Sequence, residues 1–218
     1  MGLIRNNLPA DVVAEPAPQP DAAALEPTAL AEHYRALDRD QRRQMVKTLA
    51  VAPHALDFVV EQARTEVDPL LSQTLFDCLI AIARLDGMEK AAVTAVLGLL
   101  RDGDAGVRSH AVGLLSAFPE TTGAIMPDLL QDPSTDVRLY ALDILQHLVH
   151  PGVPRWLNDV LDRECHPNVM ASAIDRSLEI GSTGLATRID DIAARFAGTP
   201  FIQFALTLAG QRLSGITQ

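Results

Sequence analysis

The sequence predicts an all-α protein, namely an α-α superhelix in the form of a right-handed solenoid of about five to six helical hairpins. The first observation is an internal repeat, because residues 102–115 and 132–145 lie thirty positions apart and are identical at five positions. A repeat of about this period is typical of solenoids, in which each unit buries its apolar face against its neighbours. The second observation is composition, since 48% of the residues are hydrophobic but only 4% are aromatic, and the abundant Ala and Leu favour helix. The third is that no segment shows the sustained alternation that predicts strands.

Two regions are predicted along the chain. Residues 1–26 form a Pro- and Ala-rich leader that lacks helical periodicity, and we expect it to be disordered. Its first five residues form a short apolar tip, which is either a docking peptide or a terminus without a role. Residues 27–218 form the solenoid. The N-terminus lacks the basic region and long apolar stretch of a signal peptide, so we expect a cytoplasmic protein.

Helix follows helix through the solenoid region. Proline is tolerated in the first turn of a helix, and it stands at or directly before five of the predicted starts: Pro53, Pro69, Pro133, Pro167 and Pro200. Together with the periodicity of the apolar residues, these breaks predict helices over 28–37, 39–50, 53–65, 69–85, 88–101, 105–118, 121–131, 134–149, 152–163, 167–180, 183–195 and 200–213.

The second helix of each hairpin carries one apolar stripe. Aligned on Val137, the equivalent positions are spaced by 36, 30, 32 and 32 residues, and are Leu71, Val107, Val137, Val169 and Phe201. Four residues after each anchor a small residue recurs in all but the first unit, as in Ala111 and Ala141. A small residue there allows two helices to approach closely, so we expect Ala141 to be buried. The last two units are less regular, as terminal repeats are expected to be.

Charge and composition exclude several classes of function. The net charge is −10, and residues 51–150 alone carry 14 acidic and 6 basic side chains. A surface that binds duplex nucleic acid needs Lys and Arg, and an anionic membrane surface attracts basic segments, so we predict neither partner. No apolar run approaches the roughly 18 residues that span a bilayer. Cys78 and Cys165 fall in helical patterns, and we expect both thiols to be buried.

The repeated segments resemble HEAT repeats, specifically the short HEAT-like repeats shared with phycobilisome lyases and many bacterial proteins. The resemblance lies in the pattern Asp-x-x-x-x-Val-Arg-x-x-Ala-x-x-x-Leu at 102–115 and 132–145, and in the Pro-containing segment 125–132. It is strongest over residues 88–150. The resemblance implies that first helices line the convex face and second helices the concave face. It implies no single function, because the family holds adaptors, scaffolds, bilin lyases and a metal-dependent hydroxylase.

No catalytic, metal or cofactor site is predicted. The hydroxylases of this family use repeated His-Glu dipeptides, and this chain has none. His147 and His150 share a helix turn without a nearby acidic residue, and the adjacent Cys165 and His166 are not expected to point at one another. Phosphate-binding glycine loops and zinc-binding cysteine clusters are also missing.

The charged residues of the repeat core are interpreted as structural. We expect Asp residues near the helix starts to cap the helices. We expect Arg108 and Arg138 to reach the loop of the neighbouring repeat. The Asp residues concerned are Asp102, Asp104, Asp132 and Asp136.

The candidate binding residues are those that face outward from the second helices, two and six positions after each anchor. They are Gln73, Ser109, Leu139, Ala171 and Gln203, followed by Asp77, Gly113, Asp143, Asp175 and Thr207. We call Asp77, Asp143 and Asp175 the acidic stripe, and Gly113 leaves a gap where a partner's backbone could approach. The hypothesis is a non-catalytic adaptor or scaffold whose concave face binds a protein or peptide, and the acidic stripe would suit a basic one. The alternatives are an ordinary solvated face, or a bilin-lyase-type enzyme or assembly factor that holds a cofactor or client subunit.

Overall fold

The computed structural model describes residues 21–102, 104–181 and 183–215, and all regular secondary structure in these residues is helical. The α-helices are α1 (Pro27–Ala36), α2 (Arg39–Thr48), α3 (Leu56–Thr65), α4 (Pro69–Ala83), α5 (Glu89–Leu97), α6 (Ala105–Ser116), α7 (Pro119–Leu129), α8 (Thr135–His147), α9 (Val153–Arg163), α10 (Pro167–Glu179), α11 (Ile189–Arg195) and α12 (Pro200–Gly215). The short 3-10 helices are η1 (Ala22–Ala24), η2 (Leu49–Val51), η3 (Pro53–Ala55) and η4 (Gly98–Arg101). Within this described part, no helix is both long and apolar enough to cross a bilayer.

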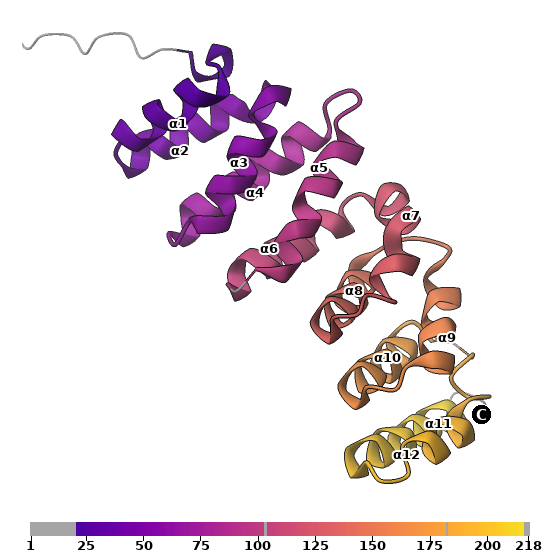
Figure 1. Cartoon of the computed structure of the whole chain (residues 1–218). Helices are drawn as coiled ribbons and strands as arrows, with labels where there is room; N and C mark the ends of the chain where they lie inside the picture. Colours follow the sequence, from indigo (N-terminus) through magenta and orange to yellow (C-terminus); the bar gives the residue numbers. More distant parts are fainter. Residues whose placement is uncertain (1–20, 103, 182, 216–218) are drawn as a thin grey trace, which may run out of the picture.

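The helices pair into six successive hairpins, α1/α2 to α11/α12, which stack into a curved row (Figure 1). The second helices pack on one another in succession, from α2 through α4, α6, α8 and α10 to α12. They run along the inner side of the curve, whereas α5, α7 and α9 lie on the outer side (Figure 1). The prediction of an all-α superhelix with second helices on the concave face is therefore confirmed.

Aspartate side chains fix several helix starts. Asp68 accepts a hydrogen bond from the backbone N–H of Leu71, and Asp104 accepts one from that of Val107. These bonds satisfy backbone donors that have no partner within the helix. Of the four Asp residues predicted to cap helices, only Asp104 does so, and the prediction is wrong for Asp102, Asp132 and Asp136. Asp102 and Asp132 accept the N–H groups of Asp104 and Ser134 inside the loops, and Asp136 lies in the first turn of α8 without a capping bond.

One continuous core runs along the row of second helices. Leu71, Val107, Val137 and Val169 are all buried, and Ala111, Ala141 and Ala173 are fully buried. The predicted stripe therefore faces the core in four hairpins. The fifth anchor, Phe201, differs because it is 48% exposed. In the described residues no further helix packs over that position.

Four of the predicted helices are divided or shortened in the structure. The predicted helix 88–101 divides into α5 and η4, and the end of 39–50 and the start of 53–65 form η2 and η3. The predicted helix 183–195 begins only at Ile189. A turn precedes it, in which Gly181 has a φ of 66°, a conformation that favours glycine.

The boundary of the leader also differs from the prediction. Residues 21–26, placed in the leader, contain η1, which is capped by Asp21 and buries Ala22. His54 Nε2 lies 3.0 Å from the carbonyl oxygen of Leu25. Packing on the solenoid therefore begins before residue 27. The remainder of the predicted leader, residues 1–20, lies outside the described residues.

Candidate functional site

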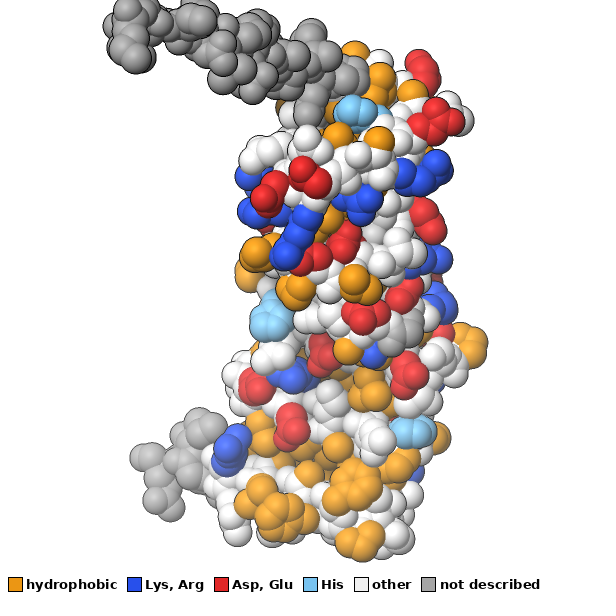
Figure 2. Space-filling view, turned by 90° about the vertical axis from the view of Figure 1, so that its left-hand side faces the viewer, with side chains coloured by type: hydrophobic (Ala, Val, Ile, Leu, Met, Phe, Trp, Pro, Cys, Tyr) orange, Lys and Arg blue, Asp and Glu red, His pale blue; other side chains and the backbone are white. Residues whose placement is uncertain are grey.

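The predicted binding residues fall into two groups by exposure. Six are exposed: Gln73, Asp77, Ser109, Gly113, Asp175 and Thr207. Four are partly buried: Leu139, Asp143, Ala171 and Gln203. Figure 2 shows the side of the solenoid formed by the second helices, where acidic, basic and uncharged side chains alternate. The concave face is therefore polar and mixed in charge and does not form one continuous acidic surface.

A first polar cluster joins α4 to α6. The Gln73 amide donates a hydrogen bond of 2.9 Å to Asp77, and Gln73 Oε1 lies 3.2 Å from His110 Nε2. The His110 ring stacks on Phe76 with a centroid distance of 4.8 Å. The structure thus joins two of the predicted residues, Gln73 and Asp77, by a hydrogen bond. The structure adds His110 to this cluster. The prediction from sequence covers only positions two and six residues after each anchor, and His110 stands three residues after its anchor, Val107.

A second cluster lines a cavity of about 390 Å³ between α6 and α8. It contains the predicted residues Ser109 and Asp143, and its other polar side chains come from Arg108, Tyr140, Gln146 and His147. The Arg108 guanidinium lies over the Tyr140 ring, 5.4 Å from the centroid. The prediction from sequence did not identify Tyr140 and His147, because it counts positions along one helix at a time. A cavity between two helices is lined by residues from both.

Asp143 is the distinctive group of this cavity. Its side chain is half-buried, and burial raises the pKa of Asp143, although Arg176 and His147 act to lower it. No described residue donates a hydrogen bond to this carboxylate. A carboxylate that has lost part of its hydration, and that receives no hydrogen bond from the protein, can accept a hydrogen bond from a bound molecule.

The remaining predicted positions differ in their surroundings. Asp175 is exposed on α10, next to Arg176, which pairs with Glu179 at 2.5 Å. A Cβ atom built on Gly113 would meet nothing within 4 Å, so the space above it is open. Leu139 and Ala171 pack partly against the core, and their assignment as outward-facing residues is only half correct.

Gln203 is engaged within its own hairpin. Its amide donates hydrogen bonds to the carbonyl oxygens of Ala193 and Phe196, at 2.8 and 3.0 Å. These bonds close the C-terminal end of α11 and hold the last hairpin together. Thr207 remains exposed, although its hydroxyl donates to the Gln203 carbonyl at 2.9 Å.

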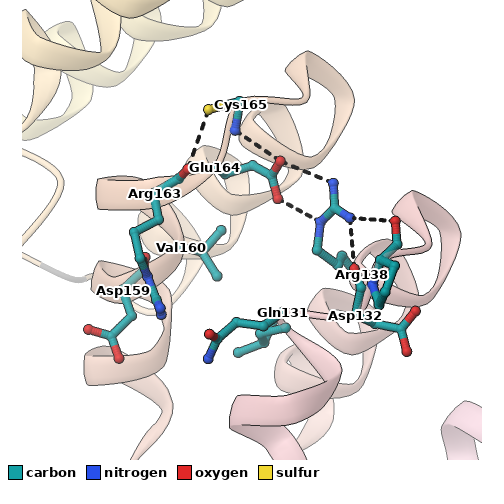
Figure 3. Close-up of a pocket in the computed structure, with 10 residues that line it drawn as sticks. Gln131, Asp132, Arg138, Asp159, Val160, Arg163, Glu164 and Cys165 are labelled. Carbon is teal, nitrogen blue, oxygen red and sulfur yellow. Dashed lines mark hydrogen bonds and ion pairs between the residues drawn. The ribbon is translucent and has the colours of Figure 1, made fainter.

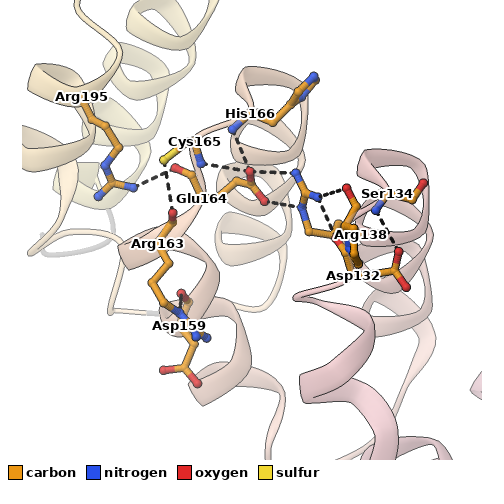
Figure 4. Close-up of polar contacts among 10 residues, drawn as sticks. Asp132, Ser134, Arg138, Asp159, Arg163, Glu164, Cys165, His166 and Arg195 are labelled. Carbon is orange, nitrogen blue, oxygen red and sulfur yellow. Dashed lines mark hydrogen bonds and ion pairs between the residues drawn. The ribbon is translucent and has the colours of Figure 1, made fainter.

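The loops between first and second helices carry a separate set of ion pairs. Arg138 forms two hydrogen bonds to Glu164, at 2.8 and 3.2 Å, and donates a third to the Asp132 carbonyl at 2.8 Å. The Glu164 carboxylate also accepts the backbone N–H groups of Cys165 and His166 (Figure 4). Arg138 therefore reaches the loop of the next hairpin, as predicted. Arg108 instead bonds the carbonyl of Asp102 in its own hairpin.

These pairs define the electrostatics of the loop edge. Burial acts to raise the pKa of Glu164, but Arg138 and the two backbone N–H groups outweigh it, and the pKa lies below its usual value. A cavity of about 390 Å³ opens beside this pair (Figure 3). Because Arg138 and Glu164 already bond to one another, this cavity offers fewer unpaired polar groups to a binding partner than the cavity that holds Asp143.

The cysteines do not share one environment. Cys78 is buried within α4, as predicted, whereas Cys165 is exposed at the loop edge, so its predicted burial is wrong. The reason is position, because Cys165 precedes α10 and lies outside its apolar stripe. Within residues 21–102, 104–181 and 183–215, no group of three or more His, Cys, Asp or Glu side chains is placed to hold a metal ion.

Comparison with known proteins gives structural similarities at low identity. No protein-family model matches the chain, and no curated protein matches it. A designed armadillo repeat protein in complex with the peptide (KR)4 is 15% identical over 88% of this chain and 96% of its own, with a TM-score of 0.37. A second designed armadillo repeat protein is 16% identical over 87% and 100%, with a TM-score of 0.33. An engineered protein is 14% identical over 88% and 97%, with a TM-score of 0.34. Sequence identities and TM-scores this low do not support an inference about function.

Proposed function

We propose that this protein is a non-catalytic scaffold or adaptor, built from HEAT-like repeats, that binds a segment of another protein on its concave face. The observation that carries the proposal is the cavity between α6 and α8, where the half-buried Asp143 carboxylate lacks a hydrogen-bond donor among the described residues. The Gln73–Asp77–His110 cluster on one side and the exposed Asp175 on the other extend the polar surface over four consecutive second helices. Solenoids present such extended concave surfaces to their ligands.

The charge distribution supports a partner segment that contains Lys or Arg. Residues 51–150 carry 14 acidic and 6 basic side chains, a net charge of −8. The two arginines near Asp143 are already engaged, because Arg108 binds the Asp102 carbonyl and Arg176 pairs with Glu179. A cationic side chain placed in the cavity would provide the donor that Asp143 lacks and would contact the Tyr140 ring.

The test removes the acidic stripe without changing the shape of its side chains. In the triple variant Asp77→Asn, Asp143→Asn and Asp175→Asn, we expect the partner to bind several-fold more weakly and with less dependence on salt, because charges at a binding surface act largely on encounter. The fold should be preserved, since the exposed Asp77 and Asp175 contribute little to stability, and burial disfavours the charge of the half-buried Asp143. The measurement is affinity purification from the native cell with quantitative mass spectrometry, followed by titration of the purified partner at several salt concentrations.

A matched control removes three charges from the first helices. Asp57, Asp128 and Asp190 are exposed on α3, α7 and α11, and their replacement by Asn changes the net charge equally. We expect this control to retain the wild-type set of bound proteins. Equal recovery of every bound protein with the two triple variants would show that the acidic stripe is an ordinary solvated surface.

A further inference from the structure

The last second helix presents an apolar face that its predecessors bury. In α8 the positions Val137, Ala141 and Ile144 are at most 1% exposed. Their equivalents in α12 are Phe201, Ala205 and Leu208, of which Phe201 is 48% and Leu208 42% exposed. Phe204, one helical turn after Phe201, is 65% exposed. We call Phe201, Phe204 and Leu208 the terminal face, and Figure 2 shows hydrophobic side chains gathered at the end of the solenoid that α12 forms.

The repeat geometry explains what kind of structure fits this face. Each internal second helix packs on the second helix before it and on the one after it. Two positions that α8 buries, Val137 and Ile144, correspond to Phe201 and Leu208, which α12 leaves open, and Phe204 lies beside them. The terminal face therefore has the spacing and chemistry to accept another helix of the same type. Terminal repeats with a polar outer surface normally prevent such contacts.

The opposite end of the solenoid does not provide that helix. In α2 the exposed side chains are polar or charged, namely Arg39, Asp40, Gln41, Gln44, Lys47 and Thr48. Stacking α12 of one copy on α2 of another would cover these charges with aromatic side chains, and buried unpaired charges are costly. A head-to-tail chain of copies is therefore disfavoured.

Charge favours a contact between two C-terminal ends. Residues 151–218 carry 7 acidic and 6 basic side chains, a net charge of −1, whereas residues 51–150 carry a net charge of −8. Two copies that meet through α12 bring together nearly neutral parts and hold their acidic centres apart. We propose that the terminal face binds the terminal face of a second copy of this chain, forming a twofold-symmetric dimer in which α12 packs on α12.

The contact has twofold symmetry because the same surface of each copy forms both sides of it. Phe201 and Phe204 supply its centre, because aromatic side chains dominate the energetics of such interfaces. The contact lies at the end of the row and leaves the cavity between α6 and α8 uncovered. It is therefore independent of the proposed concave binding surface.

The first experiment measures mass in solution by sedimentation equilibrium. We expect the wild-type chain to shift with concentration towards twice its monomer mass of 23.5 kDa. Phe204→Glu is expected to remain a monomer, because the new charge would be buried in the contact. The control is Val149→Glu, at a residue that is 88% exposed elsewhere in the chain, and this variant should dimerise like the wild type. A wild-type chain that stays monomeric, or a dimer that Phe204→Glu leaves unchanged, overturns the proposal.

The second experiment tests which ends meet. In a Cys165→Ser background, Phe204→Cys places a thiol at the middle of the terminal face, where a twofold axis brings it close to its own copy. We expect mild oxidation to give a disulfide-linked dimer, and expect none from Val149→Cys in the same background. Cross-linking at 149 without cross-linking at 204, or a series of larger oligomers, would reject the twofold contact.

Discussion

Replacement of Ala141 by Glu is expected to lower the free energy of unfolding by about 3–5 kcal/mol, the range for an uncompensated buried charge. Ala141 is fully buried in α8, which packs against both α6 and α10. A glutamate side chain at this position would be forced between packed helices. Because each hairpin is stabilised by its neighbours, the loss would spread along the row. Chemical denaturation followed by far-UV circular dichroism measures the change.

The control for this substitution is Ala124→Glu. Ala124 is exposed in α7, and the same change there is expected to alter the free energy of unfolding by no more than about 0.5 kcal/mol. Equal denaturation midpoints for the two variants would mean that Ala141 does not lie between helices.

Replacement of Arg138 by Met is expected to lower the free energy of unfolding by about 3 kcal/mol, because it leaves a nearly buried carboxylate without its cation. The Arg138 and Glu164 side chains are only 16% and 8% exposed. Arg188 and Asp162 make a similar two-bond contact, but these side chains are 25% and 50% exposed. Arg188→Met is therefore the matched control, with an expected loss of at most about 1 kcal/mol. A larger loss for Arg188→Met than for Arg138→Met would contradict this ranking.

The same pair predicts how stability depends on acid. The pKa of Glu164 in the folded chain lies below its usual value of 4.5, so the folded state binds the proton more weakly than the unfolded state. The stabilisation is therefore complete above the usual pKa and is lost as the pH falls through the folded-state value. In the Arg138→Met variant this acid-dependent loss should be smaller, which denaturation at neutral and acidic pH would measure.

Much of the fold could be predicted because the determinants are local. The apolar spacing of each second helix, the small residue at Ala141, and a proline in the first turn of α4 are visible in the sequence without knowledge of the tertiary structure. The capping role of Asp104 follows from its position just before a helical segment. The expectation that second helices lie on the inner side of the curve comes from the resemblance of the repeated segments to HEAT repeats.

The errors concern residues whose environment depends on a neighbouring hairpin. Phe201 and Val137 occupy equivalent sequence positions, but only Val137 has a following helix to cover it. Gln203 is outward-facing by its offset, yet the short helix α11 places two carbonyl oxygens within its reach. The cavity that holds Asp143 lies between two helices, and a periodic count along one helix cannot identify its other wall.

The contrasting environments of the two cysteines provide a chemical reporter within the natural sequence. Cys78 is buried, and this burial raises the pKa of its thiol to about 12, so we expect a maleimide reagent to modify it only when α4 opens. Cys165 is exposed at the loop edge and accepts a fluorophore directly. The native chain therefore labels at one position, and the rate at which a second label appears on Cys78 reports how often α4 opens. Opening of the solenoid interior can thus be timed without introducing a mutation.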